Sequence, residues 1–168
     1  MDDKRIYLLA QFDNDTNKKI IGIYDILIQA GMIGEQTKDI PYHITLGSID
    51  LEHENEVLEH TQAVCQKTKA FNIALSYIGL FGLNVLFLAP AINTELLRLY
   101  SDLVPGGVVD GSHPWAAHAT LLMDTPDHIQ AAIPIVSHAF SPFIAENESI
   151  GVYEFFPKKF ITEYKLNA

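Results

Sequence analysis

The segment PYHITL at residues 41–46 shares the pattern His-x-Thr-Leu with AHATL at residues 117–121. Alternate residues of a β-strand point to the same face, so each pattern is expected to place its histidine beside its threonine. The apolar residues between them are expected to face a core. Two of the seven histidines stand in this pattern, in corresponding places of the two halves, which indicates a paired site. Its four side chains are His43, Thr45, His118 and Thr120.

Hydrophobic periodicity predicts the same order of elements around each motif: strand, helix, histidine strand, helix and strand. In the first half, one helix runs from a cap at Asp15 or Thr16 to a stop at Gly31, and a second helix carries its apolar stripe over residues 57–68. The expected strands of this half cover residues 6–12, 43–49 and 71–80.

The second half repeats this order, with one helix capped near Asn93 or Thr94 and another that begins at Thr125. Pro134 is expected to kink or shorten the second of these helices. The polar pair Asn147-Glu148 is expected to form a hairpin turn between two late strands. The expected strands of this half cover residues 84–88, 118–123, 142–146, 149–155 and 160–166.

These elements predict an α+β fold built from a duplicated unit. In this two-lobed fold, antiparallel sheets line a central cleft and helices pack on the outer faces. No linker rich in Pro, Gly or Ser divides the sequence. Residues 1–168 are therefore expected to form a single bilobal domain with approximate lobe halves 1–82 and 83–168.

The charge of the chain limits its partners. Eleven Lys and Arg residues against 21 Asp and Glu residues give a formal net charge of −10. A field of this sign repels polyanions, so long duplex nucleic acid is not an expected partner. A small nucleotide or an oligonucleotide end remains a suitable ligand, because a few local donors can hold one phosphate. The oligomeric state is left open.

Cysteine usage and hydropathy indicate the compartment. Cys65 is the single cysteine, so neither a disulfide framework nor a cysteine metal site is expected, and a reducing cytoplasm is the natural location. Residues 1–13 lack the long apolar core of a secretory signal. The most apolar stretch, residues 77–92, is too short for a membrane span and is interrupted by Gly82 and Pro90, so no membrane association is expected.

Two histidines and two threonines on strands suit phosphoryl transfer without a metal ion. Imidazole titrates near pH 6.5, so close to neutral pH one ring can accept a proton while the other donates one. A threonine hydroxyl beside each ring can hold a non-bridging phosphate oxygen and stabilise the charge that grows there. The expected reaction is an in-line attack, with one histidine as base and the other as acid, and which does which stays open.

With both motifs, the chain resembles the two-histidine (2H) phosphoesterase superfamily, which includes 2′-5′ RNA ligase-like proteins and nucleotide cyclic phosphodiesterases. The resemblance covers nearly the whole length, because members are bilobal and carry one His-x-Thr or His-x-Ser motif per lobe. It implies that His43 and His118 are the catalytic pair, that Thr45 and Thr120 bind phosphate, and that no metal or other cofactor is needed. The residues after the motifs lack the basic side chain that many RNA-acting members carry there, which argues against long RNA as substrate.

The resemblance implies hydrolysis of a 2′,3′-cyclic nucleotide phosphate or a related cyclic phosphodiester. A 2′-5′ phosphodiesterase or RNA ligase activity is the alternative within the same family. From a different class, the chain can be a non-catalytic nucleotide-binding module that kept the site and lost turnover.

Other interpretations of individual residues stay open. His43 and His118 can be partly buried histidines satisfied by backbone carbonyls, with threonine present because it favours strands. His113 and Trp115 are candidate substrate contacts, although His113 can be a simple loop residue and Trp115 can stack on a base or line the core. A cluster of His43, His113 and His118 would form a metal-dependent hydrolase centre, but no carboxylate at suitable spacing supports a metal. Tyr42 is expected to face away from His43 and to pack.

Overall fold

The structure is a computed structural model that describes residues 5–35, 39–104, 114–155 and 157–168. Within these ranges the chain forms one antiparallel sheet of seven strands, four α-helices and a short 3₁₀ helix at Leu51–His53. The strands are β1 (Arg5–Phe12), β2 (His43–Asp50), β3 (Phe71–Phe81), β4 (Val85–Ala91), β5 (Ala119–Met123), β6 (Phe143–Glu154) and β7 (Lys159–Lys165). The helices are α1 (Asn14–Gln29), α2 (Glu54–Lys67), α3 (Thr94–Leu103) and α4 (Pro126–Ala139).

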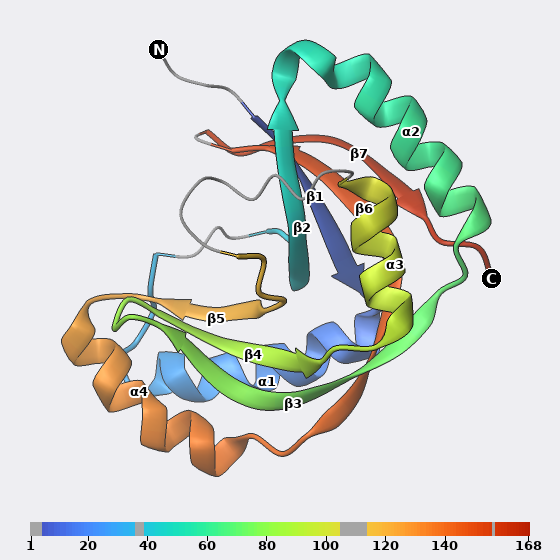
Figure 1. The fold of residues 1–168 in the computed structure, drawn as a ribbon. Coiled ribbons are helices and arrows are strands. Elements are labelled where there is room, and N and C mark those ends of the chain that lie inside the picture. The colour runs from blue at the N-terminus through green and yellow to red at the C-terminus, as the bar shows by residue number, and fades with distance from the viewer. Residues whose placement is uncertain (1–4, 36–38, 105–113, 156) are drawn as a thin grey trace.

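The strands follow the order β2-β1-β6-β3-β4-β5, and β7 pairs with β6 outside this path. β6 joins the two parts of the sheet, because its residues 147–154 pair with β1 and its residues 143–147 pair with β3. The sheet is strongly bent, so that β3, β4 and β5 run across β1 and β2 (Figure 1). The antiparallel strands expected from the sequence therefore all belong to one continuous bent sheet.

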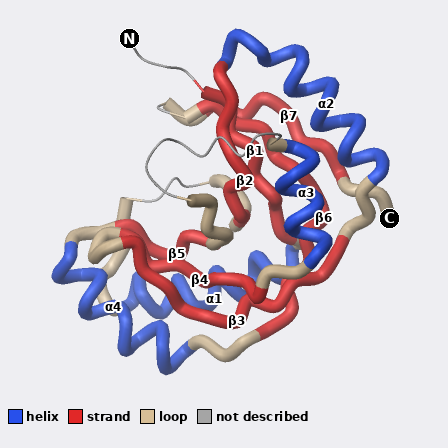
Figure 2. Tube along the Cα trace, viewed as in Figure 1, coloured by secondary structure: helices blue, strands red, loops and turns tan. Residues whose placement is uncertain are grey.

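The helices cover two parts of this sheet. α2 and α3 contact each other and pack on β2, β6 and β7, whereas α1 and α4 contact each other and pack on β4, β5 and β6 (Figure 2). The strands bury alternate residues against the helices, such as Ile44 and Leu46 of β2 and Ala119 and Leu121 of β5. The residues between them, including the motif threonines, face away from the helices.

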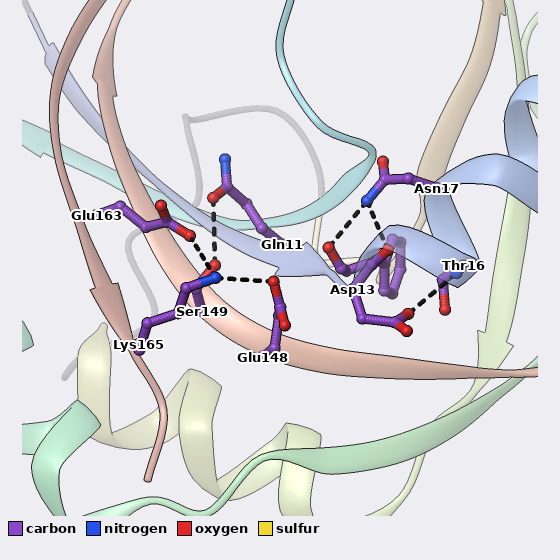
Figure 3. Close-up of polar contacts among 9 residues, drawn as sticks. Gln11, Asp13, Thr16, Asn17, Glu148, Ser149, Glu163 and Lys165 are labelled. Atoms are coloured by element: carbon purple, nitrogen blue, oxygen red, sulfur yellow. Dashed lines mark hydrogen bonds and ion pairs between the residues drawn. The ribbon is translucent and has the colours of Figure 1, made fainter. Parts of the chain in front are cut away.

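Side-chain caps explain where two helices begin. The carboxylate of Asp13 accepts a hydrogen bond from the Thr16 backbone N–H at 3.0 Å, so α1 is capped there (Figure 3). The expected cap at Asp15 or Thr16 is wrong, because both residues lie inside the helix and Thr16 is buried. Asn93 caps α3 as predicted, accepting from the Leu96 N–H at 3.0 Å.

α4 continues through Pro134 to Ala139, so the expected shortening of this helix is wrong. A proline inside a helix removes one backbone donor and destabilises the helix. Ile129 and Val136, on either side of the proline, are fully buried in the core. Their packing outweighs the local cost, which tertiary contacts often do with intrinsic helix propensity.

β6 passes through Asn147 and Glu148, so the expected hairpin turn at these residues is wrong. Asn147 pairs with Phe12 of β1 and with Phe71 of β3, which makes it the residue at which both parts of the sheet meet. The pairing register with β1 shifts between Gln11 and Phe12, which is typical of a β-bulge that accommodates an extra residue. The two polar residues therefore mark a bulge within one long strand.

Strands from the two halves of the chain pair with one another in the same sheet. The boundary expected between residues 82 and 83 falls in the turn that joins β3 to β4, and these two strands pair with each other. Gly82 adopts a φ of 53° at this turn, a conformation that glycine reaches at little cost. β6 from the second half lies between β1 and β3 from the first. A single domain over residues 1–168 stays our proposal.

Candidate active site

The two motif histidines come from opposite ends of the sheet order. His43 is the first residue of β2, and His118 directly precedes β5. Because the sheet bends, β2 and β5 approach each other across the molecule (Figure 1). The rings are near enough for a charge on His118 to lower the pKa of His43. The fold thus brings together the two motifs that the sequence predicted as a pair.

Both histidines make the same hydrogen bond to the backbone two residues earlier. Nδ1 of His43 lies 2.8 Å from the carbonyl oxygen of Pro41, and Nδ1 of His118 lies 2.7 Å from that of Ala116. A carbonyl oxygen can only accept, so Nδ1 carries the hydrogen in both rings. The neutral ring then keeps the lone pair of Nε2 for a ligand. The backbone bonds expected of structural histidines therefore also leave both neutral rings in the tautomer that can accept a proton at Nε2.

Two phenylalanine rings contact the imidazole of His118. Phe81 meets it edge-to-face with ring centroids 4.7 Å apart, and the centroid of Phe87 lies 5.2 Å away. Gly79 makes room for Phe87, since a Cβ atom at this position would lie 2.3 Å from the phenylalanine ring. In the sequence these residues appear only as parts of apolar strands. Phe87 comes opposite Thr120 because β4 pairs with β5, and the sequence alone does not reveal this pairing.

Burial lowers the pKa of both imidazoles. The pKa of His43 falls from 6.5 to about 4 through burial and the charge of His118, against the opposite effect of the hydrogen bond to Pro41. Burial also lowers the pKa of His118, against the effect of its bond to Ala116. Both rings are therefore neutral at pH 7 without a ligand. A bound phosphate anion raises both pKa values, which allows one ring to be protonated.

The motif threonines lie half-buried on the same face as their histidines. Thr45 pairs with Leu9 of β1, and Thr120 pairs with Phe87 of β4. Neither of these two strand partners carries a polar side chain, so the threonines supply the hydroxyl groups of these two pairs. Their phosphate-binding role, which the family resemblance implies, stays a prediction.

Gln11 of β1 is a polar neighbour that lies directly opposite His43. Its side chain is buried, accepts a hydrogen bond from the Ser149 hydroxyl at 3.3 Å and donates one to the Tyr153 hydroxyl at 3.3 Å. Figure 3 shows Gln11 and Ser149 beside the ion pairs of Lys165. A glutamine inside an apolar strand was the available sequence signal for this buried polar row.

The backbone just before His43 is held by the start of α1. The N–H of Tyr42 donates to the side-chain oxygen of Asn17 at 2.6 Å, and its carbonyl accepts from the Phe12 N–H at 3.2 Å. Asn17 also donates to the carbonyls of Phe12 and Asp13 (Figure 3). The Tyr42 side chain packs against the core, as predicted. These bonds fix the place at which β2 presents its histidine.

Trp115 lies beside the first motif although it precedes the second in sequence. Its indole N–H donates to the carbonyl oxygen of Thr45 at 3.0 Å. The ring stacks on Tyr100 of α3, with centroids 4.0 Å apart and planes 10° from parallel. One face of the Trp115 indole and its N–H group, which the sequence offered as a substrate contact, are therefore occupied by contacts within the protein.

His113, the other candidate contact, falls outside the residues that the structure describes. The hypothetical metal centre of His43, His113 and His118 includes it. Over the described ranges, no group of three or more His, Cys, Asp or Glu side chains is arranged to hold a metal ion.

The fold and the site together define a class of protein. A bent antiparallel sheet brings two His-x-Thr strands together, and within the described residues neither Nε2 atom has a hydrogen-bond partner. This arrangement is that of a two-histidine phosphoesterase. A family model described as the 2′-5′ RNA ligase superfamily matches residues 34–154, and the chain belongs to this superfamily. Its membership supports a phosphodiesterase enzyme in general terms.

Solved structures share the fold at low sequence identity. E. coli LigT in its apo form matches with a TM-score of 0.64 and 17% identity over 98% of each chain. A protein described as a phosphoesterase matches with a TM-score of 0.63 and 18% identity, over 99% of this chain and 100% of its own. The protein TT0787 of Thermus thermophilus gives 0.59 and 11%, over 96% and 97%.

These likenesses confirm the predicted α+β fold class. No curated protein sequence matches the chain. None of the described helices has the length and apolar character that crossing a membrane requires.

Proposed function

We propose that the protein hydrolyses a 2′,3′-cyclic nucleotide phosphate, or a related cyclic phosphodiester, without a metal ion or other cofactor. The observation that carries this proposal is the matched pair of imidazoles, both with Nδ1 on a backbone carbonyl and with no partner for Nε2 among the residues that the structure describes. Each ring has a threonine two residues later in the sequence. Such a pair can flank one phosphorus atom, with an acid on one side and a base on the other.

In the proposed reaction, the neutral imidazole takes a proton from water through Nε2 while the water oxygen attacks phosphorus. The bond from phosphorus to a ribose oxygen breaks on the opposite side, and the protonated imidazole gives that oxygen its proton. Thr45 and Thr120 donate hydrogen bonds to the non-bridging oxygens, where negative charge grows. The product is a phosphomonoester, and the two rings have exchanged their protonation states.

The electrostatics of the pair support this division of roles. The charge on His118 that lowers the pKa of His43 opposes a state in which both rings are protonated. A phosphodiester carries one negative charge and stabilises one imidazolium ion. The substrate complex is therefore expected to hold the singly protonated pair that the reaction needs.

We propose a small nucleotide or an oligonucleotide end as the substrate. The formal net charge of −10 disfavours a long polyanion. LigT, which shares the fold, has been crystallised in complexes with 3′-AMP, ATP, NADP+ and phosphate. Those ligands belong to the size class proposed here. Because the single cysteine argues for a reducing compartment, the cytoplasm is the proposed location.

A 2′-5′ phosphodiesterase or RNA ligase activity is the second candidate, because the matching family model carries that description. A 2′-5′ linkage presents a phosphorus atom bonded to two sugar oxygens. The same acid and base could cleave it, and the reverse reaction would join two ends.

Turnover assays after exhaustive chelation test the proposal. We expect 2′,3′-cyclic mononucleotides to be converted to monoesters, with a higher kcat/KM than 2′-5′ dinucleotides. Loss of activity on chelation that one metal ion per chain restores would show that a metal-free mechanism is wrong. Binding of the cyclic nucleotide without single-turnover product would identify a non-catalytic nucleotide-binding module.

A further inference from the structure

We propose that Trp115 is a positioning residue that holds the first His-x-Thr motif in register with the second. The inference rests on the proposed function, because it assigns a role in the same site. It differs from the substrate contact considered for this residue, since Trp115 would act on the protein backbone and through it on the two histidines.

The two motifs need such a link because the sheet does not supply one. β2 and β5 stand at opposite ends of the strand order, and no strand pairing joins them among the residues that the structure describes. An edge strand leaves backbone groups outside the ladder, and these can bond to other parts of the protein. The indole N–H of Trp115 reaches the Thr45 carbonyl of β2 at 3.0 Å. Trp115 stands three residues before His118, so this single bond ties the segment that leads into β5 to the first motif.

The indole is itself held in place by α3. Tyr100 stacks on it with centroids 4.0 Å apart. α3 contacts β2, and the packing is close at the end of the helix: a Cβ atom at Gly47 of β2 would lie 3.0 Å from a methyl group of Val104, the residue that follows α3. The helix, the strand and the tryptophan therefore form a closed set of contacts around Thr45. Movement of Thr45 relative to His118 would break the hydrogen bond or the stack.

This restraint matters because both rings and both threonines must contact one phosphate group. A misplacement of about 1 Å can cost roughly a hundredfold in rate, even when the altered residue is remote from the reacting atoms. Loss of the indole N–H should therefore lower kcat by about tenfold to a hundredfold. KM should change little, since each half of the site can still bind its share of the substrate.

The test uses Trp115→Phe, which keeps an aromatic ring for Tyr100 and removes the N–H donor. The matched control is Tyr24→Phe, which removes another side-chain hydrogen bond to a backbone carbonyl, that of Ile33, outside both motifs. Each variant is assayed on a 2′,3′-cyclic nucleotide and on ribose 2′,3′-cyclic phosphate, which lacks the base. We expect Trp115→Phe to lose the same factor in kcat on both substrates and Tyr24→Phe to keep normal kcat.

A loss confined to the substrate that carries a base would overturn the proposal and assign Trp115 to base stacking. Normal turnover of folded Trp115→Phe on both substrates would overturn it as well.

A second measurement does not depend on activity or on the folding of a variant. Trp115 is the only tryptophan of the chain, so its indole N–H gives one NMR signal. We expect that N–H to exchange with solvent at least tenfold more slowly than a free indole. Exchange at the free rate would overturn the proposal. If the wild type turns over no phosphodiester while the N–H stays protected, the proposed function is wrong but the link that Trp115 makes between the two motifs is still supported.

Discussion

At the scale of the residue, the proposed chemistry depends on a hydrogen bond that each motif makes within its own segment. The carbonyls of Pro41 and Ala116 hold the Nδ1–H groups of His43 and His118. Because each acceptor comes from the same short segment as its ring, the tautomer is set locally. The rest of the fold then has to bring the two segments together.

Stability should decrease as the pH falls from about 6.5 to about 4. The pKa of His43 is about 4 in the folded protein and 6.5 as the ordinary value, so the unfolded chain binds more protons between these limits. The contribution of neutral His43 is complete above pH 6.5 and is lost as the pH falls through this window. Urea unfolding of the wild type and of His43→Gln at pH 7, 6, 5 and 4 measures it. The slope of free energy against pH should be smaller in the variant, and equal slopes would contradict the lowered pKa.

The value of kcat/KM should be greatest below pH 6.5. The pH profile of kcat/KM reports groups of the free enzyme, and the reactive pair is singly protonated between its two pKa values. Burial lowers the pKa of both His43 and His118 from 6.5. We therefore expect a bell-shaped profile with its maximum on the acid side of pH 6.5. Steady-state assays over pH 4 to 9 give the profile, and a maximum above pH 7.5 would rule out the lowered values.

Thr45→Val and Thr120→Val should each lower kcat by roughly tenfold to a thousandfold, because each removes one donor to the charge that develops on phosphate. Valine keeps the branched shape that a strand favours, so the midpoint of thermal unfolding should change little. Thr162→Val on β7 is the control, since Thr162 is also half-buried but lies outside both motifs. A normal kcat in either motif variant would remove that threonine from phosphate binding.

At the scale of the element, the β3–β4 hairpin supports the second histidine. Gly79 of β3 lies opposite Phe87 of β4, and Phe87 contacts His118. Phe81, at the end of β3, contacts the rings of Phe87 and His118, and its centroid lies 4.5 Å from that of Phe87. The hairpin therefore forms an aromatic wall that buries and orients one of the two rings.

Gly79→Ala should weaken this wall. The new methyl group would lie 2.3 Å from the ring of Phe87, so the ring must move away from its place beside His118. Overpacking of this kind costs about 1–3 kcal/mol in stability, and kcat should fall with it. Gly22→Ala is the matched control, because Gly22 lies in α1 with nothing within 4 Å and should gain about 0.5–1 kcal/mol. Chemical denaturation and steady-state assays of both variants check this. A normal kcat in Gly79→Ala would show that the aromatic wall is not needed to hold His118 in place.

The sequence predicted those elements whose periodicity is local. The period of two in each motif predicted that the histidine and the threonine share one face and that their apolar neighbours face the core. The burial of Ile44 and Leu46 confirms the prediction for the apolar neighbours. The hairpin turn at Asn147-Glu148 failed because polar residues signal turns, whereas a bulge at the junction of two strand pairings also accommodates them.

The partners of the site residues were not predictable in the same way. Phe87 and Gln11 come beside Thr120 and His43 through strand pairing, and pairing between distant strands leaves no periodic trace in one sequence. The hydrogen bond from Trp115 to Thr45 depends on the bend of the whole sheet and was equally hidden.

At the scale of the whole molecule, one bent sheet brings its two end strands together. β6 pairs with β1 in one part and with β3 in the other, and α2 with α3 and α1 with α4 cover these parts separately. In the proposed reaction the two histidines act on one phosphorus atom although they belong to different ends of the strand order. The central claim is that these two rings work as a unit.

A double-mutant cycle on a 2′,3′-cyclic nucleotide tests that claim most directly. His43→Ala and His118→Ala should each lower kcat by about two to four orders of magnitude, the usual size of general acid–base catalysis. The double variant should lose much less than the product of the two single losses, because groups that act as a unit are not additive. Independent losses that multiply in the double variant, or a folded single variant with near-normal kcat, would contradict a two-histidine mechanism for this protein.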